Sequence, residues 1–171
     1  PNLQRLIDRG VRTTLRSTKP PVTVPAWTTY ATGTHPGKHG CYDFFLPGKT
    51  IRDFRPATSF EIKVPTYYEL LHQAGKKTIL VNLPNSYPPR LSDQTIITDF
   101  MTYGDQYIFP ASLMEKYPEL QNYKLSPDES IKLTKSLPEY VEHIVQIERD
   151  RVAVVKKLLL QESWDHFFFL F

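Results

Sequence analysis

A threonine hydroxyl just ahead of a short predicted helix is the feature of residues 20–40 that most directly suggests chemistry. Pro25 suits the first helical position, because the N–H group that it lacks would have no partner there, and Gly33 is a typical helix stop. Thr23 is then expected to face the helix N-terminus, where free N–H groups and the helix dipole favour an anion. A hydroxyl held beside an anion site is what attack on a phosphate or sulfate ester requires.

The same segment resembles the nucleophile segment of the type I phosphodiesterase and nucleotide pyrophosphatase group of the alkaline phosphatase superfamily. In that group a Thr or Ser, one further residue and a Pro precede a small-residue helix, a Thr-Gly pair, a Pro and a His-Gly pair. The matching positions here are Thr23-Val24-Pro25, Thr32-Gly33, Pro36 and His39-Gly40. Residues 81–89 are similar to a Val-Asn-X-Pro-X-Thr-Tyr-Pro-Pro stretch of predicted phosphohydrolases and phosphomutases in that superfamily. Residues 149–171 resemble their helix and strand before a ligand-bearing loop, so the resemblance covers most of the chain and is dense in two stretches.

The resemblance implies a metal-dependent hydrolase of phosphate esters that forms a covalent phosphothreonine. Thr23 would be the nucleophile and a ligand of one of two divalent ions, zinc in this expectation, because an unactivated threonine is a poor nucleophile. The family takes its first Asp ligand from an upstream Asp-Gly element, and this sequence contains no Asp-Gly pair. The other Asp and His ligands belong to motifs beyond the strand that ends here at Phe171. We therefore expect both ends to be incomplete, the isolated chain to be inactive and the intact protein to be the enzyme.

Other interpretations stay open. Thr23 could be a helix cap, as many threonines before helices are. The chain could be an inactive α/β binding or scaffold fragment without the metal ligands. Phosphomutase or sulfatase-like activity is also possible on the same scaffold, because fold and nucleophile do not fix the substrate. The expected partner is a small-molecule phosphate ester.

Several further side chains are candidates for the substrate side of a site. Trp27 lies one turn into the predicted helix and could line the site or pack the helix on a sheet. Asp43 follows His-Gly, where related phosphodiesterases carry a polar residue near the phosphoryl oxygens, but it could also simply end a strand. Asn82, Asn85 and Tyr87 lie in a loop after a predicted strand, where functional residues often gather.

The histidines are weaker candidates for metal ligands. His35 and His39 are four residues apart, a spacing that binds metal on a helix, but Pro36 and the neighbouring glycines predict a turn in which His39 is structural. Asp165 and His166 are adjacent on a predicted strand, so their side chains should point to opposite faces and not meet at one ion.

Composition limits the class of protein. The chain has 171 residues, of which 40% are hydrophobic, which suits one globular domain or part of a larger one. A net charge of +3 without a clustered basic stripe gives no reason to expect nucleic-acid binding. A single cysteine excludes an internal disulfide framework and fits a reducing compartment. The sequence contains no apolar run of membrane-spanning length.

Hydrophobic patterning then predicts the elements that position these residues. Helices are expected over residues 1–10, 65–74 and 110–117 and from Pro138 onward, and strands over 11–17, 40–46, 78–83, 95–100 and 165–171. Alternating helices and apolar strands indicate a layered α/β fold with a mostly parallel sheet flanked by helices. Residues 1–171 would form part of one such domain, with a cap or surface excursion around residues 103–137. The apolar run 167–171 should lie inside the sheet, parallel to the strand at residues 79–83.

Overall fold

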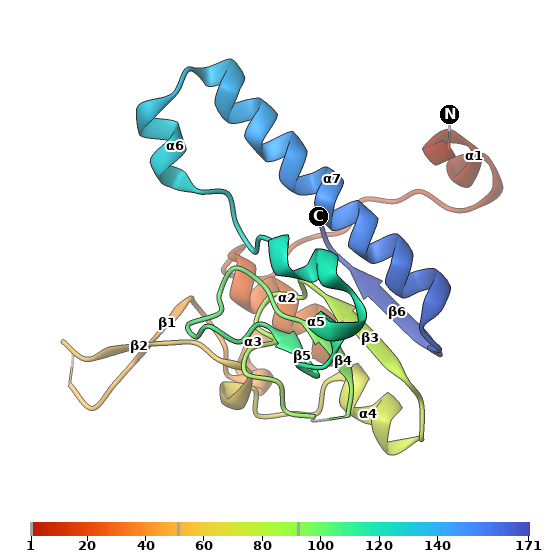
Figure 1. Ribbon diagram of the computed structural model, residues 1–171. Helices are drawn as coiled ribbons and strands as arrows, with labels where there is room; N and C mark the ends of the chain where they lie inside the picture. Colours follow the sequence, from red (N-terminus) through yellow and green to blue (C-terminus); the bar gives the residue numbers. More distant parts are fainter. Residues whose placement is uncertain (1, 51, 92) are drawn as a thin grey trace.

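The computed structural model describes residues 2–50, 52–91 and 93–171 and contains a four-stranded mixed sheet flanked by helices (Figure 1). The strand order is β5-β4-β3-β6. The strands are β3 (Thr78–Val81), β4 (Thr95–Ile97), β5 (Ile108–Phe109) and β6 (His166–Phe169). The central strand β3 pairs in parallel with both β4 and β6, whereas β5 is antiparallel to β4 at the edge. The predicted α/β class and the largely parallel pairing are thus confirmed.

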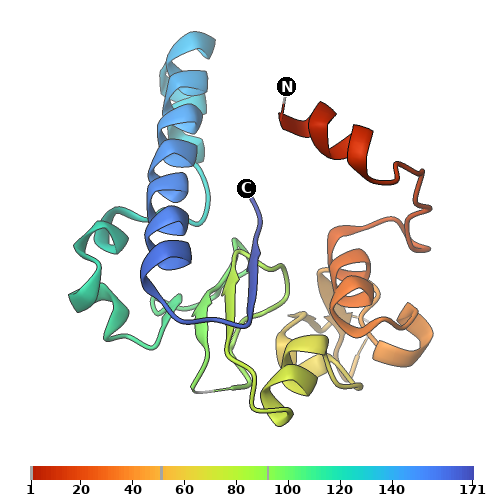
Figure 2. The same cartoon turned by 90° about the vertical axis from the view of Figure 1, so that its right-hand side faces the viewer.

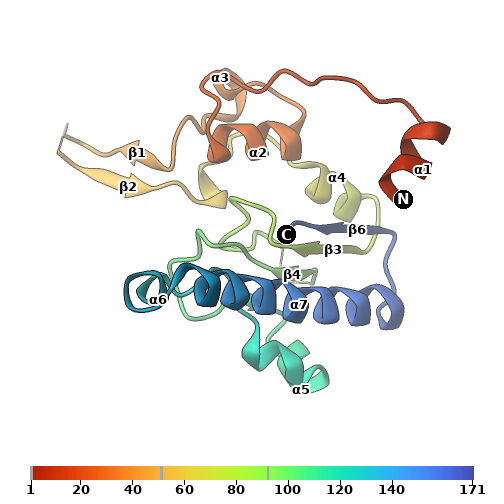
Figure 3. The ribbon, with the colours of Figure 1, turned by 90° about the horizontal axis from the view of Figure 1, so that it is seen from above.

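Helices cover both faces of the sheet (Figure 3). The helices on one face are α2 (Thr23–Thr32) and α4 (Tyr67–Gln73), and those on the other are α5 (Leu113–Lys116) and α7 (Leu137–Gln161). Side chains of β3 alternate between these two layers, as they must in a strand. Leu80 belongs to the core beneath α2 and α4, while Ile79 and Val81 belong to the core beneath α5 and α7. All four residues of β3 are buried, which explains its continuous apolar sequence.

The remaining elements are peripheral. Strands β1 (Phe45–Pro47) and β2 (Phe54–Pro56) form an antiparallel hairpin that projects from the body of the molecule (Figure 1). The other helices are α1 (Asn2–Arg9), α3 (Pro36–His39) and α6 (Glu129–Thr134), with short 3-10 turns at Ser59–Glu61 and Pro118–Asn122. In the described part of the chain, none of the helices combines the length and the apolar character needed to cross a bilayer.

The C-terminal strand is partly as predicted. It runs parallel to β3, with Ile79 opposite Phe167 and Val81 opposite Phe169, so the predicted pairing is confirmed. The predicted burial in the sheet interior is wrong, because β6 is an edge strand with β3 on one side. Phe169 is 45% exposed and Phe171 is 51% exposed. A continuous apolar run therefore indicated a strand correctly but did not fix its place in the sheet.

The N-terminal segment departs furthest from the predictions. A helix over Asn2–Arg9 is confirmed, while Pro1 lies outside the described residues. The predicted strand over residues 11–17 is wrong, since this stretch is irregular, and every residue from 2 to 17 is exposed. Figure 2 shows α1 standing apart from the sheet. Of the predicted strand at residues 40–46, only Phe45 and Leu46 are in a strand, β1. Alternating β-branched residues need a neighbouring strand before they form a ladder, and the pattern alone does not supply one.

Candidate functional site at the start of helix α2

Thr23 is the first residue of α2, so the helix begins two residues earlier than Pro25. The expected helix start at Pro25 is wrong for a simple reason: the first helical hydrogen bond runs from the Ala26 N–H to the Val22 carbonyl oxygen, so a proline at the third position loses nothing. Val22 is extended and provides no side-chain cap. The half-buried Thr23 hydroxyl therefore belongs to the first turn of a ten-residue helix whose N-terminus has no side-chain cap.

Aromatic and apolar contacts place α2 over β6 and its first turn at the carboxyl edge of the parallel strands. Trp27 packs edge-on against Phe168, with ring centroids 6.0 Å apart, near the end of β6. One turn further along α2, Tyr30 contacts Tyr67, which in turn contacts His166 at the start of β6. Tyr30 also contacts Phe168, with ring centroids 5.6 Å apart, so both rings of α2 cover β6. The start of the helix lies at the carboxyl edge because Val24 packs in one buried cluster with Met101, which belongs to the loop after β4. In open α/β sheets, ligands bind at this edge.

The loop after β3 holds α2 in place through Asn85. The Asn85 side chain is 2% exposed, and its Nδ2 donates to Thr28 Oγ1 at 3.1 Å and approaches Cys41 Sγ at 3.8 Å. Both Asn82 (φ 58°) and Asn85 (φ 65°) adopt the left-handed conformation that asparagine tolerates better than most residues. Asn85 therefore connects the loop to the middle of the helix that carries Thr23.

His39 supports the same helix from the other side. It is fully buried, its Nδ1 accepts the Cys41 N–H at 3.2 Å, and its Nε2 lies 3.0 Å from Thr29 Oγ1. Because Nδ1 is an acceptor, the neutral ring carries its proton on Nε2 and donates to Thr29. Burial, followed by the charge of His35, lowers the pKa of His39. His35 accepts the Gly37 N–H at 3.1 Å as the N-cap of α3, so both histidines are engaged in the turn that the sequence predicts.

The structure places Trp27 in the core and Asp43 on the surface. Trp27 is half-buried in the core between α2 and the sheet. Asp43 is exposed, and its Oδ1 accepts the N–H of the next residue, Phe44, at 2.7 Å. The substrate contacts expected of these two residues remain predictions.

Asp165 and His166 have separate partners, as their predicted opposite orientation requires. The Asp165 carboxylate accepts the Lys77 N–H at 2.9 Å and the Lys76 ammonium at 3.2 Å. The His166 Nε2 lies 3.2 Å from the Tyr67 hydroxyl.

The sequence analysis missed Asp99, which follows β4 at the same carboxyl edge. It is 2% exposed, and its Oδ1 accepts the Met101 N–H at 2.8 Å. Burial raises the pKa of this carboxyl to about 6, against the opposing effect of nearby backbone N–H groups. Its position directly after a buried strand was the available signal, because acidic residues at that edge often serve a site.

Asp99 opens onto a small cavity of about 160 Å³. The lining includes Asn82, Asp99, Phe100, Arg151 and Phe171, which come from the ends of all three parallel strands and from α7. Asn82 is already engaged, because its Oδ1 accepts the Tyr123 hydroxyl at 2.8 Å and its Nδ2 donates to the Leu170 carbonyl at 2.9 Å. Asp99 is therefore the side chain of this cavity with acceptor capacity to spare.

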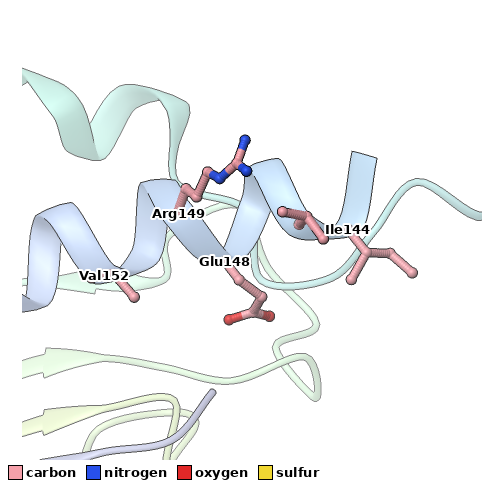
Figure 4. Close-up of a pocket in the computed structure, with 5 residues that line it drawn as sticks. Ile144, Glu148, Arg149 and Val152 are labelled. Atoms are coloured by element: carbon pink, nitrogen blue, oxygen red, sulfur yellow. The ribbon is translucent and has the colours of Figure 1, made fainter. Parts of the chain in front are cut away.

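A second hollow, of about 360 Å³, follows α7 along Ile144, Val145, Glu148, Arg149 and Val152. Figure 4 shows Glu148 and Val152 directed toward the strands and Arg149 directed away from them. It is lined by one helix alone, and its residues are remote in sequence from the Thr23 segment. It is thus an apolar surface depression without the convergent polar groups of a reaction site.

In the described part of the chain, metal-ligating side chains do not gather around Thr23. Among residues 2–50, 52–91 and 93–171, no three or more His, Cys, Asp or Glu side chains lie close enough together to hold a metal ion. The residues present therefore do not fit a two-metal centre by themselves.

The structure thus defines an α/β protein with a threonine at a helix N-terminus, beside the carboxyl ends of the parallel strands, where proteins of this class commonly bind anions. A family model described as "Type I phosphodiesterase / nucleotide pyrophosphatase" matches residues 1–166. The chain belongs to this family, which lies in the alkaline phosphatase superfamily. No curated protein and no solved structure matches the chain. Membership indicates phosphoric ester hydrolase activity for the intact protein.

Proposed function

We propose that the intact protein hydrolyses phosphate esters, with phosphodiesters as the first class to test, through a covalent intermediate on Thr23. The observation that carries this proposal is the place of Thr23 in the first turn of α2, which lacks a side-chain cap, within the segment matched by the family. The N–H groups and dipole of a helix N-terminus favour a phosphoryl group there. The substrate is a small-molecule ester.

The chain's own residues account for positioning and attack. The Thr23 hydroxyl oxygen forms a bond to phosphorus, and the bond from phosphorus to the alcohol oxygen of the ester breaks. The hydroxyl proton leaves Thr23, and the departing alcohol gains a proton. Water then cleaves the phosphothreonine and restores the hydroxyl. Asn85 and His39 act indirectly, since their hydrogen bonds to Thr28 and Thr29 hold the helix.

Metal dependence is a separate part of the proposal. The family is typically metal-dependent, and we propose two divalent ions, zinc, in the intact protein. Their ligands besides Thr23 are proposed to lie outside these 171 residues, because the described side chains do not supply them. No step is assigned to the ions. Such ions would activate the nucleophile, which an isolated threonine cannot do for itself.

Substitution of Thr23 in the intact protein tests the nucleophile. Thr23→Ala should lower turnover of a chromogenic diester by about a thousandfold or more, since roughly 4 kcal/mol of the barrier depends on the missing oxygen. Thr23→Ser should retain measurable turnover. Thr13→Ala, on the exposed N-terminal segment, is the control and should leave turnover unchanged. Mass spectrometry of acid-quenched enzyme should detect, on Thr23, a phosphoryl group that still carries the second alcohol of the diester.

Near-parental turnover in a folded Thr23→Ala protein would rule out the nucleophile assignment and favour a binding or scaffold role. The 171-residue chain alone, with added zinc or manganese, should not turn over the diester. Turnover by this chain that disappears in Thr23→Ala would show a complete site within it and contradict the proposed external ligands.

A further inference from the structure

We propose that the cavity beside Asp99 binds a neutral, hydroxyl-bearing part of the substrate's alcohol, such as a polyol or a sugar ring. The inference rests on the proposed function for the position of the phosphate. The binding chemistry itself comes from the cavity: one buried carboxylate oxygen with unused acceptor capacity, one guanidinium and an apolar wall.

The carboxylate oxygen is the principal recognition group. Asp99 Oδ1 is occupied by the Met101 N–H, while Oδ2 is buried and has no hydrogen-bond partner within the described residues. A buried acceptor without a partner is costly, so a ligand that donates a hydrogen bond to it gains more than it would at the surface. Hydroxyl groups are small enough donors for a cavity of this size.

Charge in the cavity selects against ionic ligands. The Arg151 guanidinium is 7% exposed, and it makes four hydrogen bonds, two to the Lys124 carbonyl at 3.0 and 2.9 Å, one to the Leu125 carbonyl at 2.7 Å and one to Glu148 Oε1 at 2.7 Å. It is therefore held in the wall, where its positive charge, partly balanced by the ion pair with Glu148, works against an ammonium group. The Asp99 carboxylate opposes a second phosphate or a carboxylate. A neutral hydroxyl group is repelled by neither of these charges.

The wall and the volume suit a small carbon skeleton. Phe100 is 52% exposed and Phe171 is 51% exposed, and Pro84 and Leu125 complete the apolar lining. These surfaces can cover the C–H faces of a polyol or sugar while Asp99 accepts a hydroxyl proton. The volume of about 160 Å³ is well below the roughly 300–1,000 Å³ of drug-sized ligand pockets, so the cavity holds one small group and not a whole nucleotide.

The cavity is connected to the start of α2. Met101, whose N–H binds Asp99, belongs to the same buried cluster as Val24, the residue after Thr23. The Phe100 ring lies 6.3 Å from the ring of Phe44, which packs against that cluster. The loop after β4 thus contacts the helix start on one side and lines the cavity on the other. A phosphate at Thr23 would direct its esterified alcohol along this loop.

Two matched diesters test the inference in the intact protein. The first is 4-nitrophenyl 2,3-dihydroxypropyl phosphate, and the second is 4-nitrophenyl propyl phosphate, which lacks the hydroxyls. The wild type should show a kcat/KM about tenfold or more higher for the first ester. In Asp99→Asn, where the amide oxygen can still accept from Met101 and the amide nitrogen replaces Oδ2, the ratio of the two kcat/KM values should fall to near one.

Controls separate this result from general damage. Asp150→Asn, an exposed carboxylate on α7, should keep the wild-type ratio. Phe100→Ala removes an exposed part of the wall and should lower the ratio even if Asp99→Asn fails to fold. Equal turnover of both esters by the wild type, or a preference that survives both cavity variants, overturns the inference.

Failure of the proposed function gives a different result, because then neither ester is turned over. Saturation-transfer NMR with D-ribose then decides the inference alone. Binding that is lost in Asp99→Asn supports the cavity assignment, whereas absent or unchanged binding overturns it.

Discussion

Residues 23–41 and residues 2–17 are neighbouring segments with similar apolar content but opposite environments. In the first, Val24, His39 and Cys41 are fully buried, and hydrogen bonds join it to the loop after β3. In the second, Leu3 is 77% exposed and Val11 is 94% exposed. The difference shows that an apolar pattern can predict which face of a helix or strand is apolar. Only the contacts that bury this face determine whether it stabilises the protein.

The first prediction concerns how Asp99 makes the stability of the protein depend on pH. Asp99 belongs to the loop after β4, which packs against residues 23–41 through Met101. Its native pKa of about 6 lies above the ordinary value of 3.8, so its contribution to stability is fully present below about pH 4 and is lost as pH rises toward 6. The difference in unfolding free energy between the wild type and Asp99→Asn should therefore change by about 3 kcal/mol between pH 4 and pH 7, to the disadvantage of the wild type. Urea unfolding at both pH values measures this, and a pH-independent difference would contradict the raised pKa.

The next prediction compares the two segments directly, by substituting one valine in each and measuring the unfolding free energy. Val24→Ala removes two methyl groups from a fully buried site and should lower the unfolding free energy by about 2 kcal/mol. Val11→Ala at the 94% exposed position should change it by less than about 0.5 kcal/mol. Denaturant melts of both variants give the comparison. Equal losses would mean that residues 2–17 are packed in solution and that the contrast between the segments is wrong.

The sequence predicted elements with strong local signals. Ser136, Pro138 and Glu139 mark the start of α7, where Ser136 and Glu139 form a capping box. The buried strand β3 was likewise predictable from its apolar run. Local patterns carried no information on which strand lies at the sheet edge, so the place of β6 was predicted wrongly.

The candidate site was predictable only in part. The motif around Thr23 allowed the family to be predicted, because its spacing is local. The hydrogen bond from Asn85 to Thr28 and the cavity at Asp99 join residues far apart in sequence. Such contacts depend on how the strands are ordered in the sheet, which one sequence does not reveal.

A smaller effect is expected at the contact that ties the buried segment to the sheet. Thr28→Val keeps the shape of the side chain but removes the oxygen that accepts from Asn85 Nδ2. We expect a loss of about 1–2 kcal/mol, because the buried amide is left with one partner fewer. A double-mutant cycle with Asn85→Ala should give a coupling of about 1 kcal/mol. Additive losses of unfolding free energy would show that the hydrogen bond between Asn85 and Thr28 does not contribute to stability.

The smallest change in unfolding free energy is expected for a substitution in the exposed segment, residues 2–17. Leu6 is 69% exposed on α1, whose eight residues are all exposed. Leu6→Gln preserves helix propensity and length while removing apolar surface, so its effect on the unfolding free energy should stay within about 0.5 kcal/mol. As a comparison, Tyr68→Ala at a 4% exposed position on α4 should lower the unfolding free energy by roughly 3 kcal/mol or more. A loss above 1 kcal/mol for Leu6→Gln would mean that α1 buries this face in solution, because an exposed leucine has little transfer free energy to lose.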